Sequence, residues 1–488
     1  MSDRDRLPVV VGVAQVTQRV EPTDAVEPVA LMEQAVRAAG ADSGSDTLLS
    51  RVDRIVVVRG AWSYPDPGRI VAERIGATDA RTYLSPNGGN APQSALTKSA
   101  ASIQSGELDA AVICGGEVIY SRQKLRALGQ KLASTRQEGV EAAAVLGSEL
   151  DMSGELETAR GFDRPPVIYP LFDSAIRHHR GETLDEHRDR ISRLWAGFNR
   201  VAAASEHSWV RTPMTATEIR EPGPGNRMVG FPYTKAMNSN WFVDQAAAVI
   251  VCAAEVAEAA GVAPDRWVFV RSGTDGHATA RFSERHDFWS SPAIRETANA
   301  ALELADLGID DIGPIDLYSC FPSVVQLAMA ELGMADDREV TQTGGLTFAG
   351  GPLNNYVTHG IAATVEAVRE RGEPGLVHAN GGYATKQAFG VYSPIPPDQF
   401  RHRDLQDLID SYPTRAVDGG FVGEAVVEAY TVMYDHEGPE HAQVTLLTDS
   451  GERVLARSDE GSVMDALLEA DRIGDRARVP AEGTVALD

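Results

Sequence analysis

Cysteine is scarce in this chain of 488 residues. The three cysteines, Cys114, Cys252 and Cys320, lie far apart and form no Cys-x-x-Cys pair. The sequence therefore predicts neither a disulfide framework nor a metal site. Each cysteine is expected to be a small buried hydrophobic residue rather than a reactive thiol.

Long apolar runs are missing as well. No run approaches the roughly 20 residues of a membrane-spanning helix, and the opening MSDRDRLPVV lacks the apolar stretch of a secretory signal. We expect no membrane span and a cytoplasmic location.

Basic residues are few relative to acidic ones. Lys and Arg number 45 against 70 Asp and Glu, a formal net charge of −25, which opposes binding of nucleic acid over a broad face. Local basic patches could still hold a nucleotide-bearing ligand. The P-loop, GxGxxG, HExxH and GxSxG patterns are also absent. The sequence therefore gives no motif evidence for a P-loop NTPase, a dinucleotide-binding domain, a zinc protease or a serine hydrolase.

What the chain does contain is an alternation of apolar strand-like runs with helix-like ones, typical of an α/β protein with buried strands. The expected strands are PVVVGVAQ, RIVVV, AAVIC, WVFVRS, IDLYSC and GLVHA.

One unit occurs twice. The stretch SAASIQSGELDAAVICGGE (99–117) gives a helix end, a glycine, an acidic residue, an apolar strand and a Gly-Gly pair, and TVEAVRERGEPGLVHANGGYA (364–384) repeats that order. Each copy follows a Gly-rich turn, SPNGGNAPQ in the first and GGLTFAGGPLNNY in the second. The repetition predicts a duplicated α/β domain whose two Gly-rich helix entrances are related by pseudo-symmetry.

Two further segments differ from this body. The long polar stretch before residue 235 contains Ile191, Leu194, Trp195 and Phe198 at helical spacing, so a lid or binding subdomain with its own helices is expected. After Pro413, three β-rich runs, the helix SVMDALLEA with Ser462 as its cap, and the short strand RARV predict a small barrel of the OB type.

The first Gly-rich turn precedes a helix, expected from Ser94 to Ser105, in which Lys98 is the only charged residue. A helix of small and apolar residues is buried, so its N-terminus is expected to open inside the molecule. Free N–H groups there need partners, and a ligand or reaction centre is one such partner. Turn geometry alone is the structural alternative.

The chain resembles the thiolase superfamily in four segments. Residues 244–249, DQAAAV, resemble the thiolase Asp-Gly-Ala-Ala-Ala-Val stretch, and DLYSCFPSVVQLAMAELGM resembles the Asn-Glu-Ala-Phe or His-Asp-Cys-Phe motif. GGLTFAGGPLNNY resembles the Gly-His-Pro segment, and HANGGYA the Cys-x-Gly segment. Order and spacing agree from about residue 5 to about 400. Within the superfamily the chain resembles the sterol-carrier-protein thiolases and the actinobacterial thiolase-like proteins type 1, which carry an added C-terminal domain.

The resemblance implies the five-layered αβαβα thiolase fold, in which the N-termini of two buried helices meet at the active site. We expect residues 1–120 with 236–265 as one half, 266–412 as the other, 121–235 as the loop subdomain, and 413–488 as an added OB-like domain. The implied ligand is CoA or an acyl-CoA, with no tightly bound cofactor. The family usually forms dimers, and a monomer is also open because the added domain could cover that surface.

In this resemblance, the positions of the family's catalytic residues are occupied by residues of other types. The nucleophilic cysteine falls on Gly89, the Asn or His of the third motif on Tyr318, the histidine of Gly-His-Pro on Gly351, and the acid/base cysteine on Ala379. A glycine cannot form an acyl-enzyme. Candidate substitutes are Cys320, His359 and His378, each with a purely structural alternative.

A CoA ligand would need contacts for its phosphates. The candidates are Gly88, Gly89 and Asn90 at the turn, and basic residues of the loop segment, namely Arg177, His178, His179, Arg180, Arg188, Arg190 and Arg193. The alternative is a solvated helix face on which these side chains pair with neighbouring acids.

Three functions remain open from the sequence: an acyl-CoA C-acyltransferase, a CoA or acyl-CoA binding protein without turnover, and a cysteine-independent thioester reaction such as retro-aldol cleavage by Tyr318 and His378. The space above Gly89 discriminates among them. An open space favours ligand or thioester chemistry, and filling by Tyr318 and Asn90 favours a structural role.

Overall fold

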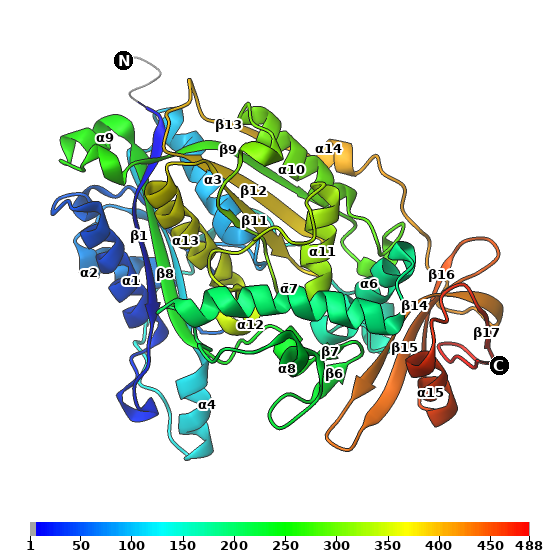
Figure 1. Cartoon of the computed structure of the whole chain (residues 1–488). Coiled ribbons are helices and arrows are strands. Elements are labelled where there is room, and N and C mark those ends of the chain that lie inside the picture. Colours follow the sequence, from blue (N-terminus) through cyan, green and yellow to red (C-terminus); the bar gives the residue numbers. More distant parts are fainter. Residues whose placement is uncertain (1–5, 488) are drawn as a thin grey trace.

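The computed structural model describes residues 6–487, whose centre is one long sheet of eleven strands (Figure 1). Ten strands follow the order β10-β11-β12-β9-β1-β8-β4-β2-β3-β5, and β13 pairs with β9. The N-terminal strands are β1 (Pro8–Thr17), β2 (Arg54–Val57), β3 (Arg81–Leu84), β4 (Ala110–Val118), β5 (Ala144–Val145) and β8 (Asp244–Ala253). The C-terminal strands are β9 (Val268–His277), β10 (Ile315–Asp316), β11 (Gly375–Gly381), β12 (Lys386–Ser393) and β13 (Arg401–Asp404).

The strand pairing repeats between the two halves. In the first half β2 is parallel to β4, and β4 and β1 are both antiparallel to β8. In the second half β10 is parallel to β11, and β11 and β9 are both antiparallel to β12. The halves join where β1 pairs with β9. The duplication predicted from the repeated unit is therefore present.

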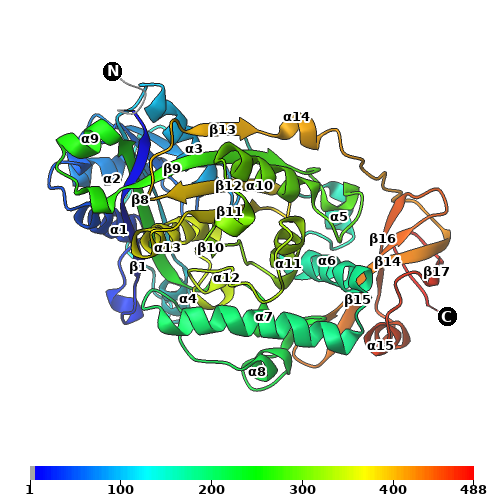
Figure 2. The same ribbon diagram turned by 45° about the horizontal axis from the view of Figure 1, so that its top comes forward.

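Helices lie between the two halves of the sheet and on both outer faces (Figure 2). Helices α3 (Ala91–Gln104) and α13 (Tyr356–Arg371) each contact strands of both halves. Helix α1 (Pro28–Ser43) covers β1, β4 and β8 from outside, and α10 (Pro292–Leu304) covers β9 and β12. The order is helix, sheet, helix, sheet, helix, the αβαβα arrangement of thiolases.

Small residues allow this close layering. A Cβ atom at Gly273 of β9 would lie 2.7 Å from Cγ2 of Thr97 in α3, so only glycine lets the strand and the central helix approach so closely. The strands facing these helices are buried almost throughout. The apolar runs of the sequence are therefore strands covered on both faces, as expected for an α/β body.

The remaining elements are shorter or lie in the loop segment. Outside the layers named so far are α2 (Pro67–Ile75), α4 (Ile119–Ala127), α5 (Glu155–Ala159), α6 (Pro165–Arg180), α7 (Leu184–Ala204), α8 (Ala216–Arg220), α9 (Ala254–Ala259), α11 (Pro322–Glu331), α12 (Gly345–Phe348) and α14 (Gln406–Ile409). Short 3₁₀ turns span Pro22–Asp24, Leu49–Arg51, Lys235–Met237, Pro264–Arg266, Phe282–Glu284, Ile309–Asp311 and Leu353–Asn355.

Helix α7 is the amphipathic helix that the sequence predicted. Thr183 caps its N-terminus in a capping box with Glu186, and Ile191, Trp195 and Phe198 are buried on its inner face. The expected strand IDLYSC is wrong in length, because β10 ends at Asp316. The chain must leave the sheet there to bring Tyr318 over the Gly-rich turn and to begin α11 at Pro322.

The C-terminal part forms a second, antiparallel sheet. It contains β14 (Gly423–Tyr434), β15 (Pro439–Leu447), β16 (Arg453–Ser458) and β17 (Arg476–Val479), with helix α15 (Gly461–Glu469). Two strands of the loop segment, β6 (Met228–Gly230) and β7 (Tyr233–Thr234), extend this sheet beyond β14. The strands and helix agree with the sequence, and the OB-like assignment stays a prediction.

The expected cap of α15 is wrong. Glu460 is the N-cap residue and Ser462 lies within the first turn of the helix. The hydroxyl of Ser458 instead accepts a hydrogen bond from the Glu460 backbone N–H, at 3.3 Å, and so orders the chain before the helix.

The C-terminal sheet is fixed to the body by a buried arginine. Arg453 of β16 is fully buried, donates through Nε to Glu428 at 2.6 Å, and donates through Nη1 to the backbone oxygens of Ser283 and Arg285. Its guanidinium also lies over the ring of Phe288. The hydrogen bonds therefore join the added domain to a loop of the second thiolase half.

Candidate functional site

The Gly-rich turn at the start of α3 is filled on its interior side. A Cβ atom at Gly89 would lie 2.5 Å from the carbonyl oxygen of Asn380 and 2.7 Å from Cε2 of Tyr318, and it would also overlap the Tyr318 hydroxyl. The Asn380 oxygen belongs to the backbone and cannot swing away. Close packing therefore requires glycine at position 89, and a side chain there would force Tyr318 to move.

The second Gly-rich segment and the end of β11 both contact this turn, and the Gly88 backbone N–H donates to Asn354 Oδ1 at 3.2 Å. Gly88 has a φ of 141°, which glycine tolerates, and the backbone of Gly88 and Gly89 packs against Gly381 at the end of β11. The side-chain oxygen of Asn90 points toward Gly88 and Gly381. Gly89 is buried, as the sequence predicted for the helix entrance, whereas Gly88 and Asn90 are half-buried and Asn87 is exposed.

Tyr318 acts as a plug above Gly89. Its ring packs edge to face against Tyr356, with 5.6 Å between centroids, and the side chain is 8% exposed. Burial raises the pKa of the Tyr318 phenol well above its usual value, so the hydroxyl stays protonated. Of the two roles open from the sequence, donating to a thioester carbonyl and filling the cavity, the packing favours filling.

Cys320 lies close to this plug but is not activated. Burial raises the pKa of the Cys320 thiol to about 12, and a hydrogen bond with Tyr169 only partly offsets this effect. The thiolate is the nucleophilic form of cysteine, and it requires a cation, a base or a helix N-terminus to lower the pKa. The Cys320 thiol therefore remains neutral at physiological pH.

A chain of neutral hydrogen bonds passes through Asn380, whose backbone oxygen packs against Gly89. His378 on β11 donates from Nε2 to Gln387 Oε1 at 2.8 Å, and Gln387 donates from Nε2 to Asn380 Oδ1 at 3.0 Å. Asn380 donates to the Tyr169 hydroxyl at 3.3 Å, and that hydroxyl donates to the Gly382 carbonyl at 2.8 Å. Every donor in this chain points the same way, which fixes the side chains in one arrangement.

The two candidate histidines are both buried in neutral form. Burial lowers the pKa of His378 to about 4, although the Gln387 hydrogen bond opposes the shift, and the ring stacks on Phe389. Burial lowers the pKa of His359 on α13 to about 3, and repulsion from His207 adds to this. Ala379, next to His378, is fully buried and brings no polar atom to the site.

A very small cavity lies beside Gly350, the neighbour of Gly351. It measures about 10 Å³ and is lined by His359, Gln245, Tyr356 and Gly350, among others. His359 donates from Nδ1 to Gln15 Oε1 at 3.1 Å, while its Nε2 has no partner among the described residues. A cavity of this size has room for about one water molecule and excludes an acyl chain.

The basic residues of the loop segment are engaged in ion pairs, hydrogen bonds or ring contacts within the protein. Arg177 and His178 both contact Asp471 of the C-terminal part, each at 2.7 Å. Arg180 pairs with Glu182 at 2.9 Å, and Arg188 donates to the backbone oxygen of Arg220 at 3.1 Å. Of the remaining candidates, Arg193 lies 3.8 Å from Asp189, Arg190 pairs with Glu182, and His179 stacks on Trp289.

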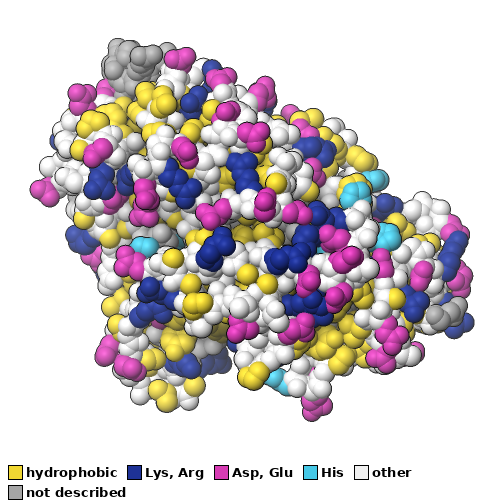
Figure 3. Space-filling model, in the orientation of Figure 1, with side chains coloured by type: hydrophobic (Ala, Val, Ile, Leu, Met, Phe, Trp, Pro, Cys, Tyr) yellow, Lys and Arg dark blue, Asp and Glu magenta, His cyan; other side chains and the backbone are white. Residues whose placement is uncertain are grey.

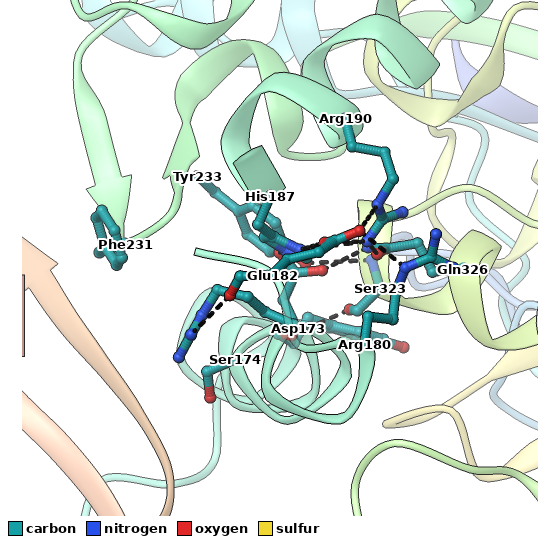
Figure 4. A network of polar contacts seen from close by, with 12 residues as sticks. Asp173, Ser174, Arg180, Glu182, His187, Arg190, Phe231, Tyr233, Ser323 and Gln326 are labelled. Carbon is teal, nitrogen blue, oxygen red and sulfur yellow. Dashed lines mark hydrogen bonds and ion pairs between the residues drawn. The ribbon is translucent and has the colours of Figure 1, made fainter. Parts of the chain in front are cut away.

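Figure 4 shows how far this pairing extends into the protein. His187 lies between two carboxylates, 2.9 Å from Asp173 and 2.8 Å from Glu182, and Arg190 also contacts Gln326 of α11 at 2.8 Å. These bonds join α6, α7 and α11. The face seen in Figure 3 likewise carries acidic and basic side chains interspersed. The geometry therefore favours the structural alternative for the basic residues, and phosphate binding by them stays a prediction.

The sequence did not single out Tyr169, Asn380 or Lys386, all of which contact the turn or the residues that close it. Tyr169 comes from the loop segment, and the backbone oxygen of Asn380 contacts the turn at Gly89. Lys386 donates from Nζ to the carbonyl of Asn87 at 2.7 Å. No local pattern marks such contacts, because each joins segments far apart in the chain.

A solved relative covers the whole chain. A monomeric SCP2-thiolase-like protein type 1 from Mycobacterium smegmatis is 31% identical, with 100% of each chain covered and a TM-score of 0.85. This chain belongs to the SCP2-thiolase-like protein type 1 family. The thiolase-like protein type 1 additional C-terminal domain matches residues 404–484.

Other relatives of this thiolase-like protein are more distant. An acetyl-CoA acetyltransferase from Methanothermobacter thermautotrophicus is 28% identical over 218 residues, which are 39% of this chain and 55% of that protein. The match thus spans only about half the length of that curated relative. The Ltp2-ChsH2(DUF35) aldolase, 17% identical over 80% of this chain and 98% of the other with a TM-score of 0.60, shares the fold. No helix among residues 6–487 is long and apolar enough to cross a membrane.

Proposed function

We propose that this thiolase-like protein binds CoA or an acyl-CoA and does not carry out thiolysis. The observation that carries the proposal is the filled space above Gly89, where Tyr318 and the Asn380 carbonyl leave no room for a nucleophilic side chain. Membership of the family supports CoA or an acyl-CoA as the ligand. The filled space above Gly89 is evidence against thiolysis.

The neighbouring groups support the same conclusion. Thiolysis through an acyl-enzyme needs a nucleophile and a base within hydrogen-bond reach of each other. Gly89 supplies no nucleophile, Cys320 remains a thiol because burial raises its pKa, and the buried imidazoles of His359 and His378 are held by amide side chains. Loss of a covalent nucleophile removes the two-step route itself.

We further propose that the protein is a monomer. The relative from Mycobacterium smegmatis is described as monomeric. Here the short strand β3 of the first half is covered by β5 of the same chain, with Tyr83 opposite Ala144 and Leu84 opposite Val145. A covered edge cannot pair with a second copy over those residues. No tightly bound cofactor and a cytoplasmic location stay expectations from the sequence.

The test is a mass-spectrometric time course with CoA and a panel of 3-ketoacyl- and 3-hydroxyacyl-CoA thioesters, with binding measured by calorimetry on the same samples. We expect binding without conversion. Thiolytic products at catalytic turnover would overturn the proposal, as would the absence of binding to every CoA compound in the panel.

Variants separate the remaining reactions. If thiolysis occurs, Cys320→Ala should abolish it, because Cys320 is the cysteine beside the filled site. For retro-aldol cleavage the sequence predicted roles for Tyr318 and His378. Unchanged cleavage rates in Tyr318→Phe and His378→Ala would exclude those roles.

A further inference from the structure

The opposite side of the Gly-rich turn borders an open groove. Its volume is about 750 Å³, and its walls are one face of α3, the ends of β9 and β12, and residues 146–150. Asn90 and Ser94 of the helix line it, whereas Tyr318 and Cys320 do not. Ligand sites in proteins commonly have volumes of this size.

Strand register brings three titratable side chains to this groove. Lys386 on β12 lies opposite His277 on β9, and Ala388 lies opposite Asp275. Directly opposed residues and every second residue along a strand share one face of a sheet. Lys386, His277 and Asp275 therefore project to the same side as Gly273, which faces α3.

Lys386 is a desolvated amine at one end of the groove. Its side chain is 8% exposed, and its Nζ lies 3.6 Å from where a Cβ atom at Gly88 would be. No carboxylate among the described residues lies within ion-pair distance of it, and the amine donates a hydrogen bond to the Asn87 carbonyl. Burial lowers the pKa of Lys386, while the more distant Glu149 and Asp151 act in the opposite direction.

A carboxyl group on the neighbouring strand, Asp275, is hydrogen-bonded to a hydroxyl on the helix, Ser94. The Ser94 hydroxyl on α3 donates to the carboxylate of Asp275. Burial raises the pKa of Asp275 to about 6, although the Ser94 hydrogen bond and the charge of Lys98 both oppose the shift. A carboxyl group that titrates near neutral pH can both give and take a proton. The other charged or titratable groups lining the groove are Arg54, Glu107, Glu149, His402, Arg403 and Asp404.

We propose that Lys386 captures a small aldehyde or ketone in this groove as a Schiff base. The Nζ lone pair attacks the carbonyl carbon, a C–N bond forms, and the carbonyl π electrons move to oxygen, which takes a proton. The nitrogen then loses one proton to give the carbinolamine. A further proton delivered to the hydroxyl lets it depart as water and leaves the protonated imine. Asp275, supported by Ser94, is the group placed to shuttle these protons. The ligand has a polar body, because the groove is lined mainly by hydrogen-bonding side chains.

The test traps the imine by reduction. The protein is incubated with dihydroxyacetone or acetoacetate in the presence of sodium cyanoborohydride, and peptides are mapped by mass spectrometry over time. We expect Lys386 to gain the mass of the probe less one oxygen atom several-fold faster than the exposed Lys124, because its lowered pKa leaves a larger share of the amine neutral.

Matched variants complete the test. Lys386→Arg keeps the charge and a donor for the Asn87 carbonyl, and it should abolish fast labelling, whereas Lys98→Arg in the same groove should leave it unchanged. Asp275→Asn should slow labelling and flatten its dependence on pH around pH 6. Labelling of Lys386 no faster than Lys124 in the native protein overturns the proposal, and this comparison needs no variant to fold. Labelling of Lys386 does not depend on acyl-CoA binding, because that binding is measured in a separate experiment without reductant. Failure of one proposal is therefore distinguishable from failure of the other.

Discussion

The two sides of the turn at Gly88 and Gly89 are built in opposite ways. The interior side holds Tyr318, the Asn380 carbonyl and a chain of neutral hydrogen bonds. The outer side faces a polar groove with a lysine and a carboxyl group. The turn and its helix are shared, so the difference comes only from the side chains that other segments bring to each side. One backbone element can therefore face close packing on one side and titratable side chains on the other.

Truncating the plug should have the largest effect on stability. Tyr318→Ala removes a buried aromatic ring and should reduce the free energy of unfolding by about 3 to 5 kcal/mol. Urea denaturation measures the loss. As a control on the groove side, Lys98→Ala changes an exposed residue and should change stability by less than about 0.5 kcal/mol. Similar losses in the two variants would contradict the contrast between the two sides.

Adding a methyl group at Gly89 should be the next most damaging change. Gly89→Ala inserts a Cβ atom against Tyr318 and the Asn380 backbone and should cost about 1 to 3 kcal/mol. In the double variant with Tyr318→Ala the loss should be smaller than the sum of the single losses, because the two residues compete for one space. Gly197→Ala is the matched control, since a Cβ atom there meets nothing and lies within α7.

The interior histidines should make stability depend on pH. The pKa of His378 is lowered to about 4 in the folded protein, so the unfolded chain takes up its proton first as the pH falls below about 6.5. Stability is complete above that pH and should fall by about 1 kcal/mol per unit between pH 6.5 and pH 4. His378→Gln should reduce this slope in denaturation experiments at several pH values. An unchanged slope would mean that His378 is not buried in neutral form.

The smallest effect is expected on the groove side. The pKa of Asp275 is raised to about 6 in the folded protein, so above that pH its charged carboxylate destabilises the fold. Below about pH 4 the carboxyl group is protonated in both the folded and the unfolded protein, and this effect disappears. Asp275→Asn should therefore stabilise the protein at pH 7, by less than about 1 kcal/mol because the residue is only half-buried, and should change nothing at pH 4. Asp404→Asn, an exposed residue in the same groove, is the control. A destabilised Asp275→Asn at pH 7 would show that the carboxylate is held by favourable contacts.

Local patterns in the sequence predicted much of the fold. The repeated unit gave the duplication, the apolar runs became buried strands, and the small residues of α3 placed that helix between the layers. The structure differs from these predictions where contacts with distant segments outweigh the local preference of the chain. The expected strand at 315–320 shortens because Tyr318 packs across the molecule, and the C-terminal sheet takes two strands from the loop segment.

The sequence by itself carried the resemblance to thiolases, and with it the fold family and the prediction that Gly89 stands at the nucleophile position, because residue identity along the motifs is a property of the chain alone. Only the tertiary structure decided that Tyr318 fills the space above Gly89, that the basic residues of the loop segment pair with acids, and that Lys386 lies beside the turn. These contacts join residues far apart in the chain. Their geometry is set by how the layers pack, and no pattern of neighbouring residues encodes it.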